Sequence, residues 1–330
     1  MKQVLLYDPA IGSINLGDAI ISASARTALA PLLSDAFVMR MSTHTPAGRF
    51  YLRHFVRSVD LRFVLGSNLL MGHLNGRFRQ WDINWLNAPH VGPVVLMGVG
   101  WWQAGQTWNR YTRSVYRRVL SDVYLHSVRD ALTESRMREM GFENVINTGC
   151  PTTWGLTPSH CAAVPAGRSA EVVTTLTDYM PDPRRDRHLL QTLKRRYERV
   201  HIWLQGAGDA AYLAELGESE QTVGIIPPTL EAYDAMLSGT RNIEFIGTRL
   251  HGGIRAIQHS RRALVIGIDS RAREMQADIG LPVLEAEAIE MLEAAIDSVR
   301  PLDIRLPQAG IDRFLAQFIP AQETEQEGLS

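Results

Sequence analysis

Residues 248–253, with the sequence TRLHGG, combine side chains that could bind an anion and move a proton. They follow a short apolar segment, 243–247, which predicts a β-strand, and they open a segment that predicts a helix. The first N–H groups of a helix point outward unpaired, and Gly252 lets a ligand approach the backbone closely. Arg249 can hold a carboxylate or phosphate through two hydrogen bonds, and His251 titrates near neutral pH. The turn is therefore predicted to bind a small anion whose reaction needs a proton transfer. The alternatives are a structural histidine and a salt-bridged arginine.

Two further predicted strand-to-helix turns carry charged side chains. Arg129 follows segment 123–127 and could clamp a carboxylate or phosphate, or instead pair with a neighbouring helix, while Asp130 is the better N-cap candidate there. In the glycine-containing loop 12–18, Asp18 stands where an N-cap belongs. For Asp18, the alternatives of helix cap and cleft-facing base or hydroxyl acceptor both stay open. The loop lacks the G-x-G-x-x-G pattern and a P-loop lysine, so a nucleotide site of either kind is not predicted.

Several polar and aromatic side chains are candidates for the acceptor side of such a site. Trp101, Trp102 and Trp108 lie in one predicted loop, and flat apolar rings suit the C–H faces of sugars. A hydrophobic plug or a dimer contact is the alternative for these tryptophans. Gln205 follows another predicted strand and could bind a substrate through its amide, or form a plain turn. We assign Asn15, Trp101, Trp102 and Gln205 to acceptor binding.

Composition excludes several classes of protein. The 330 residues are 45% apolar and 21% charged, with a net charge of −1, so the chain is globular and has no basic footprint for nucleic acid. The arginine-rich segments 184–187 and 194–196 predict solvated helix faces, with a patch against anionic lipid as the alternative. Cys150 and Cys161 lie in no metal-binding spacing and are predicted to be small buried residues, and no metal site is expected.

The sequence also bears on location. It has no apolar run of the length, about 18 residues, that a membrane-spanning helix requires. Its first residues predict a strand entering a loop and lack the layout of a signal peptide. We expect a cytoplasmic protein, with peripheral contact at the inner face of a membrane left open.

Apolar segments alternate with helical ones along the whole chain, which indicates βαβ units and parallel sheets. We therefore expect an α/β fold of two doubly wound Rossmann-like domains facing a central cleft. Residues 1–156 form the first predicted domain, 157–170 a linker rich in Pro, Ala, Gly and Ser, 171–321 the second domain and 322–330 a disordered tail. The predicted strands are 4–7, 37–39, 62–65, 94–99, 123–127, 144–147, 171–176, 200–204, 223–226, 243–247 and 263–268.

Five segments, in order along nearly the whole chain, resemble the polysaccharide pyruvyl transferase family. The Arg-Leu-His-Gly block is the specific one among them. Arg271 and Arg273 stand where the family often has a lysine, and the third-strand glycine motif is reduced to Gly66-Ser67-Asn68. The matching segments are Asn15-Leu16-Gly17-Asp18, Ser127-Val128-Arg129-Asp130, Thr148-Gly149-Cys150-Pro151, Thr248-Arg249-Leu250-His251-Gly252 and Asp269…Glu274…Gly280-Leu281-Pro282.

The resemblance implies a two-domain glycosyltransferase-B-like fold and a ketal pyruvyl transferase, which moves pyruvate from phosphoenolpyruvate to two sugar hydroxyls and releases phosphate. By resemblance, His251 is the catalytic residue and Asp18 lies in the same cleft. Arg129, Arg249, Leu250 and Gly252 belong to the donor side. No cofactor is implied besides the donor substrate. The implied acceptor is a saccharide in surface or exopolysaccharide synthesis, with a lipid-linked acceptor left open.

Two other functions fit the same pattern of residues. A nucleotide-sugar-dependent glycosyltransferase would need an acidic residue on the ribose, which Asp269 or Glu274 could supply. A non-catalytic sugar-binding member would keep the fold alone. The acceptor sugar, the ketal position and the oligomeric state are not readable from the sequence.

Overall fold

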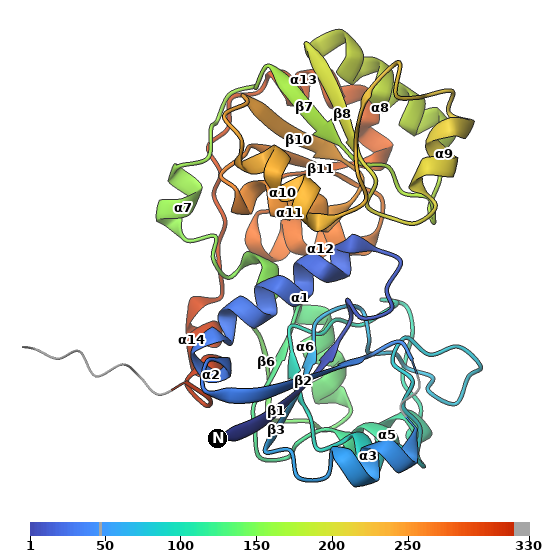
Figure 1. The fold of residues 1–330 in the computed structure, drawn as a ribbon, viewed down its shortest axis with the longest axis vertical. Helices are drawn as coiled ribbons and strands as arrows, with labels where there is room; N and C mark the ends of the chain where they lie inside the picture. Colours follow the sequence, from blue (N-terminus) through green and yellow to red (C-terminus); the bar gives the residue numbers. More distant parts are fainter. Residues whose placement is uncertain (46–47, 320–330) are drawn as a thin grey trace, which may run out of the picture.

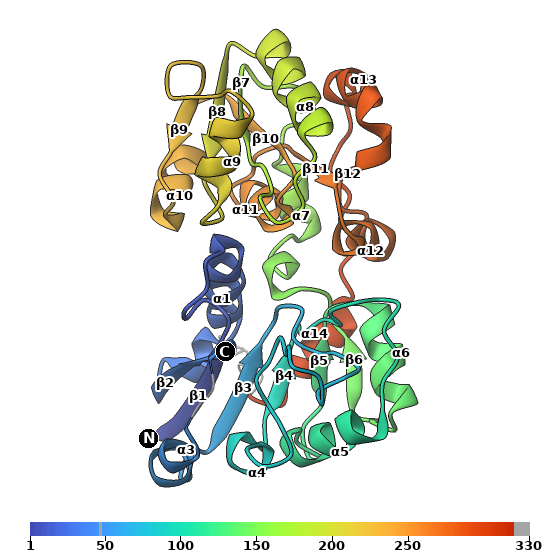
Figure 2. The same ribbon diagram turned by 90° about the vertical axis from the view of Figure 1, so that its right-hand side faces the viewer.

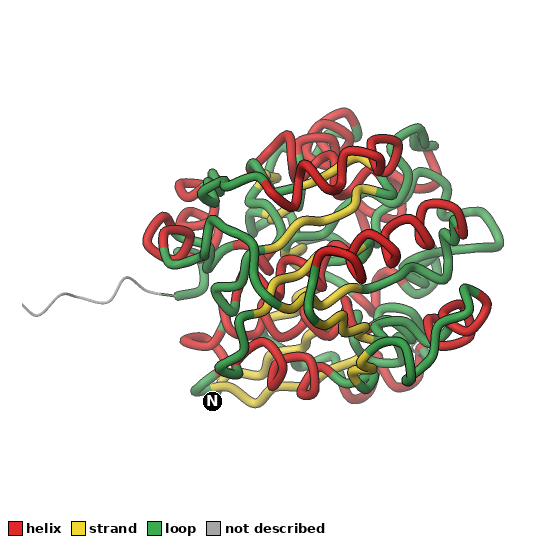
Figure 3. The backbone as a smooth tube through the Cα atoms, turned by 90° about the horizontal axis from the view of Figure 1, so that it is seen from above, coloured by secondary structure: helices red, strands yellow, loops and turns green. Residues whose placement is uncertain are grey.

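The computed structural model describes residues 1–45 and 48–319. Figure 1 shows two α/β halves stacked along the long axis of the molecule, with helix α1 (Leu16–Ala28) lying between them. Seen from above, helices flank the strands on both sides, as expected for doubly wound sheets (Figure 3). The predicted tail, 322–330, lies outside the described residues.

The N-terminal half is built on parallel strands. Strands β1 to β4 pair in the order β2-β1-β3-β4, and a parallel bridge between Val99 and Val128 continues this sheet into the pair β5-β6. The strands are β1 (Lys2–Asp8), β2 (Ala36–Ser42), β3 (Leu61–Leu65), β4 (Val95–Met97), β5 (His126–Val128) and β6 (Val145–Asn147). The remaining helices of this half are α2 (Ala30–Leu33), α3 (Arg49–Phe55), α4 (Ala88–Val91), α5 (Arg110–Val119), α6 (Ala131–Glu139) and a 3₁₀ helix (Pro151–Thr153).

The C-terminal half holds a six-stranded sheet in the order β12-β11-β10-β7-β8-β9, with all pairs parallel. Its strands are β7 (Glu171–Thr174), β8 (Arg199–Trp203), β9 (Gly224–Ile226), β10 (Ile243–Gly247), β11 (Ala263–Gly267) and β12 (Val283–Glu285). Its helices are α8 (Pro183–Arg196), α9 (Asp209–Glu215), α10 (Leu230–Ser238), α11 (Leu250–Gln258), α12 (Ser270–Ile279), a 3₁₀ helix (Ala286–Met291) and α13 (Leu292–Asp297).

Both sheets are buried on both faces, which explains their nearly continuous apolar strands. In β1, Leu5 and Tyr7 belong to one hydrophobic core while Val4 and Leu6 belong to another, because successive side chains point to opposite faces. Each predicted strand has its counterpart in the structure, although the strand expected at 123–127 begins later, at His126. The strand order, which the sequence did not predict, decides where a ligand can bind.

Each sheet reverses its strand order at one point, and the two points mark where a ligand fits. In the C-terminal sheet the reversal lies between β7 and β10, and in the N-terminal sheet it lies between β1 and β3. Crossover connections leave such neighbouring strands in opposite directions, so a crevice opens outside their carboxyl ends. The segments that follow β1, β3, β7 and β10 carry Asp18, Ser67, Asp178 and Arg249, with Asp18 in the first turn of α1.

The boundary between the halves differs from the predicted one at two places. The predicted linker, 157–170, contains a helix, α7 (Pro158–Ala162). Helix α14 (Gln308–Leu315) returns to the N-terminal half, where Phe314 packs near Trp154 and Phe318 lies 4.9 Å from Phe63, measured between ring centroids. The predicted second domain, 171–321, therefore ends before α14 (Figure 2).

Candidate active site

His251 occupies the second position of α11, directly after β10. The N-cap residue of this helix, Arg249, makes no side-chain capping hydrogen bond. The N–H groups of the first turn of α11 are therefore available to a ligand. The positive end of the helix dipole lies at the same place, so an anion is favoured there. The side chain of Leu250 packs in the apolar core, so at this position the backbone N–H is the part that faces outward.

The glycine pair after His251 has a packing role that the sequence did not predict. A Cβ added at Gly253 would lie 2.6 Å from Cγ2 of Val265, and one at Gly252 would lie 3.0 Å from Oε1 of Gln205. Helix α11 can thus lie close against β10 and β11 only because these positions lack side chains. Gly252 thus has a packing role, and its expected contact with a ligand stays a prediction.

Positive charges from two other elements surround the imidazole of His251. Burial, which has the largest effect, and the nearby guanidinium groups of Arg271 and Arg129 together lower its pKa to about 3, while the carboxylate of Asp269 opposes them. The imidazole is buried, with Nε2 lying 3.9 Å from the sulfur of Cys150. His251 is therefore neutral at pH 7 in this arrangement, within a cluster of cationic groups.

Arg271 comes from the first turn of α12 and is held by two oxygen partners. Its guanidinium donates to the carboxylate of Asp269 and, at 2.7 Å, to the hydroxyl of Tyr179. Asp269 caps α12 by accepting from the N–H of Arg271 at 3.0 Å. These contacts aim Arg271 at the region shared with His251 and Arg129.

Arg129 reaches the same region from the N-terminal half. It is buried against Gly100, where an added Cβ would lie 2.6 Å from its Nη2 and 2.8 Å from Oδ1 of Asn68. Its Nη2 lies 3.3 Å from Asp130 and 4.0 Å from Glu274 of α12. Asp130 caps α6 as predicted, by accepting from the N–H of Thr133. The ion-pair alternative for Arg129 thus holds, since its Nη2 donates to Asp130. Among the described residues, Nε and Nη1 of Arg129 make no such contact and remain as donors for an anion.

Arg249 is placed differently from the anion clamp that the sequence predicted. Its guanidinium pairs with the carboxylates of Asp178, at 2.8 Å, and Asp209, and its Nε donates to the carbonyl of Leu176 at 2.9 Å. The side chain is 2% exposed and lies 5.0 Å from the ring centroid of Tyr179. With its donors directed at these partners, Arg249 braces the loops after β7 and β8.

Asp18 faces the cluster from the opposite half. The N-cap of α1 is Asn15, whose side chain accepts from the N–H of Gly17, so the helix-cap alternative for Asp18 is wrong. The carboxylate of Asp18 accepts from the hydroxyl of Ser13 at 2.6 Å and of Ser67 at 3.4 Å. Burial raises its pKa, which the Ser13 hydrogen bond and the charges of His44 and Arg271 oppose. Asp18 and Arg271 therefore lie within electrostatic reach across the two halves.

Asn15 and Gln205, both assigned to the acceptor, contact each other, and their acceptor role stays a prediction. The side-chain N–H of Gln205 donates to Oδ1 of Asn15 at 3.0 Å, and the backbone N–H of Leu16 donates to the carbonyl of Gln205. A second bond runs from the N–H of Ala207 to the carbonyl of Ile14. This pair links the two halves beside the cluster.

In the tryptophan loop, Trp101 is a buried hydrophobic plug, which was the alternative to sugar binding. The Trp101 side chain is 3% exposed, and its indole N–H donates to the carbonyl of Gln106. Trp102 is half-buried and lies 5.2 Å from exposed Phe78, measured between ring centroids. Trp101 is therefore closed to a sugar in this structure, whereas Trp102 keeps an accessible face.

Sequence reasoning missed several members of the site. Asp178 and Asp209 accept hydrogen bonds from Arg249, and Tyr179 accepts one from Arg271. The hydroxyl of Ser67 donates to Asp18. Asp178 and Tyr179 follow β7 at the point where the strand order reverses, so a correct strand order would have indicated them.

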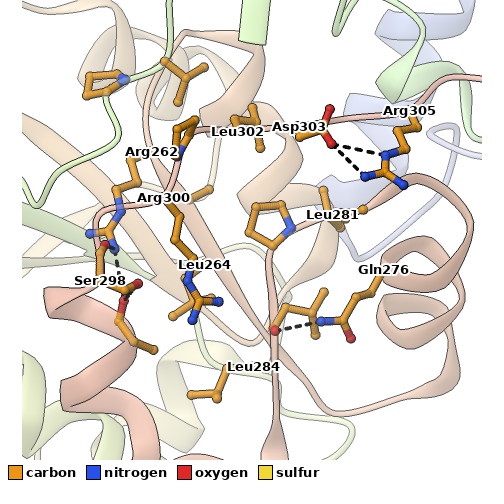
Figure 4. A pocket seen from close by; sticks show the side chains of 18 of the residues that line it. Arg262, Leu264, Gln276, Leu281, Leu284, Ser298, Arg300, Leu302, Asp303 and Arg305 are labelled. Atoms are coloured by element: carbon orange, nitrogen blue, oxygen red, sulfur yellow. Dashed lines mark hydrogen bonds and ion pairs between the residues drawn. The ribbon is translucent and has the colours of Figure 1, made fainter. Parts of the chain in front are cut away.

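A separate hollow of about 650 Å³ lies between α12, α13 and the segment 298–305 (Figure 4). Leu264 and Leu281 form part of its apolar lining, and Arg262 and Arg300 lie at its wall. None of the residues predicted for the donor or acceptor lines it.

Within residues 1–45 and 48–319, no cluster of three or more His, Cys, Asp or Glu side chains could hold a metal ion. In the same ranges, no helix is long and apolar enough to cross a membrane.

Residues 15–270 match the family model described as "Polysaccharide pyruvyl transferase". The match covers most of the chain and includes the turns that carry Asp18, Arg129 and His251. The chain belongs to the polysaccharide pyruvyl transferase family. A transferase is thus the enzyme class of this protein, as the resemblance of the five segments implied. A search of curated proteins finds no match.

A solved structure with a TM-score above 0.5 supports the fold of this pyruvyl transferase family member, and two others resemble it more weakly. A putative UDP-N-acetylglucosamine 2-epimerase from Listeria monocytogenes has a TM-score of 0.51 at 8% identity, covering 96% of this chain and 95% of that one. The apo form of the lipopolysaccharide outer core galactosyltransferase WaaB gives 0.47 at 12% identity, with coverage of 97% and 96%. The MnaA–UDP structure from S. aureus gives 0.48 at 10% identity, with coverage of 92% and 93%. The expected glycosyltransferase-B-like arrangement of two Rossmann-like domains is confirmed.

Proposed function

We propose that this protein transfers the pyruvyl group of phosphoenolpyruvate to two hydroxyls of one saccharide, forming a cyclic ketal in surface or exopolysaccharide synthesis. The observation that supports this most strongly is the grouping of His251, Arg129 and Arg271 at the open N-terminus of α11. Phosphoenolpyruvate carries a carboxylate and a phosphate close together. Two guanidinium groups and a helix N-terminus are complementary to both of these anions.

The proposed reaction balances without a cofactor. A proton adds to the CH₂ carbon of the donor, and one sugar hydroxyl bonds to C2. The C2–O bond to phosphate then breaks, and the second hydroxyl closes the ketal. One of the two hydroxyl protons replaces the proton delivered to the CH₂ carbon, and the other leaves on phosphate.

His251 is proposed as the acid that protonates the CH₂ carbon. In the free protein it is neutral, because burial and two arginines hold its pKa at about 3. A bound donor would place negative charge against Arg129 and Arg271, and this charge would raise the pKa of His251. The histidine would therefore gain its proton when the donor binds, which is when the reaction needs it.

Asp18 is proposed to accept the proton of a sugar hydroxyl. Its carboxylate faces the cluster from the N-terminal half, and burial raises its pKa toward the range useful for a base. Arg249 has a different proposed role from the donor clamp expected at first. Through Asp178 and Asp209 it would fix the loops that carry Tyr179, which in turn holds Arg271.

The test is phosphate release from phosphoenolpyruvate, screened across pyranosides with free 4,6- or 3,4-hydroxyl pairs. We expect release that depends on one class of sugar. We also expect His251→Gln to reduce kcat by about 10²–10⁴-fold, which is typical for loss of a general acid, with an unchanged melting temperature.

Two results would overturn this proposal. Full activity of His251→Gln would remove the histidine from the chemistry. Thermal stabilisation by nucleotide sugars, with none by phosphoenolpyruvate, would favour the nucleotide-sugar-dependent glycosyltransferase.

A further inference from the structure

We infer that the end of the N-terminal half farthest from the C-terminal half binds an anionic lipid bilayer. This surface, called the distal tip below, comprises α3, α4, α5 and the loops next to them. Helices α3 and α5 lie at that end in Figures 1 and 2, and Figure 2 shows α4 between them. Helix α4 packs against both α3 and α5.

Large apolar side chains stand exposed on the distal tip. Phe50 is 71% exposed and Tyr51 47% on α3, while Leu86 is 63% and Trp85 43% exposed just before α4. Trp85 is tied to α5, because its backbone N–H lies 3.2 Å from the hydroxyl of Tyr111. Four large apolar side chains on neighbouring elements exceed the scattered exposure of an ordinary surface, so a partner for this face is expected.

The charge of the distal tip is one-sided. Helices α3, α4 and α5 contain no acidic residue. Arg53, Arg57, Arg117 and Arg118 are exposed, and none of them pairs with a carboxylate of the described residues. Acidic side chains occur only in adjoining loops, and two of them are engaged. Asp60 accepts from the N–H of Gln3, Asp82 pairs with Arg79, and Asp122 follows α5.

The arginine-rich segments of the C-terminal half differ on this point. Arg185 is buried against Asp186, Arg195 pairs with Glu293, and Arg196 pairs with Asp297. Their positive charge is largely neutralised within the molecule. The lipid-facing alternative considered for segments 184–187 and 194–196 therefore fits the distal tip better than the segments themselves.

Aromatic rings beside guanidinium groups match the chemistry of a membrane interface. The guanidinium of Arg118 lies 3.6 Å from the ring centroid of Trp85, so a charged and an apolar plane present one common edge. Such edges suit the boundary between phosphate headgroups and acyl chains, where tryptophan and tyrosine rings prefer to lie. A second copy of the chain is a poorer occupant, because a symmetric contact would bring like-charged arginines together.

The distal tip is opposite the cleft, so this inference does not depend on the proposed reaction. Flotation of the full chain with vesicles tests it directly. We expect the protein to float with 3:1 phosphatidylcholine:phosphatidylglycerol vesicles, to stay behind with phosphatidylcholine alone, and to be released by salt. The double variant Arg53→Gln/Arg57→Gln should reduce the partition coefficient by about fivefold per arginine. Phe50→Ser/Trp85→Ser should also reduce the partition coefficient at low salt, although it removes no charge.

Matched changes elsewhere control for charge and apolarity. Arg184→Gln/Arg199→Gln removes the same charge from exposed positions of the C-terminal half, and Val299→Ser removes an exposed apolar side chain there. Neither should alter flotation. The inference fails if the unaltered protein does not float, or if the controls reduce flotation as much as the tip variants do. It also fails if the tip variants dissociate a dimer, seen by light scattering, without changing flotation.

Discussion

His251 lies beside two guanidinium groups, so the region around it carries an excess of positive charge until an anion binds. Buried among Arg129 and Arg271, the imidazole is neutral at pH 7. An anion bound there partly cancels the guanidinium charges, so it should raise the pKa of His251 above its value of about 3 in the free protein. The site would in this way couple donor binding to proton uptake.

This coupling can be measured with sulfate, whose own charge is constant over the relevant pH range. Between the pKa of the free protein and the raised pKa of the complex, the complex binds one more proton than the free protein. Sulfate affinity should therefore rise as pH falls through the raised pKa. Calorimetric titration at several pH values would detect this.

His251→Gln is the matched control for the sulfate experiment. It should flatten the pH dependence that comes from the imidazole, and leave any part that comes from protonation of Asp18 or Glu274, whose pKa values burial raises. A pH dependence of His251→Gln equal to that of the unaltered protein would contradict the proposed coupling.

Arg249 and Arg271 are both arginines of the candidate site, but they have different expected roles. Arg249 is expected to stabilise the fold, and Arg271 is expected to bind the donor. Removing its guanidinium leaves Asp209 buried without its cation, and Asp178 without its partner. Arg249→Met should therefore destabilise the fold by about 3–5 kcal/mol, the usual cost of breaking one side of a buried ion pair.

Arg271→Lys should instead leave the melting temperature nearly unchanged and raise the KM for phosphoenolpyruvate.

Denaturant unfolding separates the two outcomes for Arg249. An Arg249→Met variant with unaltered stability and a greatly raised KM would restore the donor clamp that the sequence predicted.

At the scale of elements, the spacing of β7 and β10 controls the site. Gly247 ends β10 beside the start of the loop after β7, and an added Cβ would lie 2.6 Å from the backbone nitrogen of Thr175. Since Thr175 accepts from the N–H of Arg249 through its hydroxyl, widening this gap also shifts the start of α11. The close approach of β7 and β10, where the strand order reverses, thus depends on the absence of a side chain at Gly247.

Gly247→Ala should cost about 1–3 kcal/mol, the range for overpacking a well-filled interior, and should reduce kcat together with stability. Gly167→Ala is the matched control, because no atom lies within 4 Å of the Cβ that it would gain. Equal melting temperatures for the two variants would show that the strands can separate freely.

Helix α12 carried a signal that the sequence reading did not use. Ala272, Met275 and Ile279 are its buried residues and recur at helical spacing, but charged residues between them hide the pattern. With this helix assigned, Asp269 becomes its cap and Arg271 a first-turn residue. The anion site could then have been predicted on α12 as well as on α11.

At the scale of the whole molecule, α14 fastens the end of the chain to the half where it began. Phe314 is fully buried there, with its ring 6.1 Å from Trp154 and 5.5 Å from Phe318, measured between centroids. The N-terminal core is therefore completed by residues that follow the C-terminal sheet in sequence. The two halves should not unfold independently of this connection.

Phe314→Ala should lower the free energy of unfolding by about 3–5 kcal/mol, because it opens a cavity in a fully packed core. Phe37→Ala, at a position 58% exposed, should change it by less than about 0.5 kcal/mol. Calorimetry that finds Phe314→Ala as stable as Phe37→Ala would mean that α14 is not part of the N-terminal core.

The sequence alone determined the βα alternation, the positions of the strands other than β12, and the turns that carry Asp18, Arg129 and His251. These follow from local apolar patterns and from a motif that is contiguous in the chain. The tertiary structure decided which arginine side chain is accessible, because that of Arg249 is 2% exposed and that of Arg271 is 23% exposed. Arg249 and Arg271 stand 22 positions apart, at equivalent strand-to-helix turns. Asp178 and Asp209, which engage Arg249, come from other strands of the sheet. Whether an arginine forms an ion pair depends on its distance from carboxylates elsewhere in the fold. A local sequence pattern does not determine those distances.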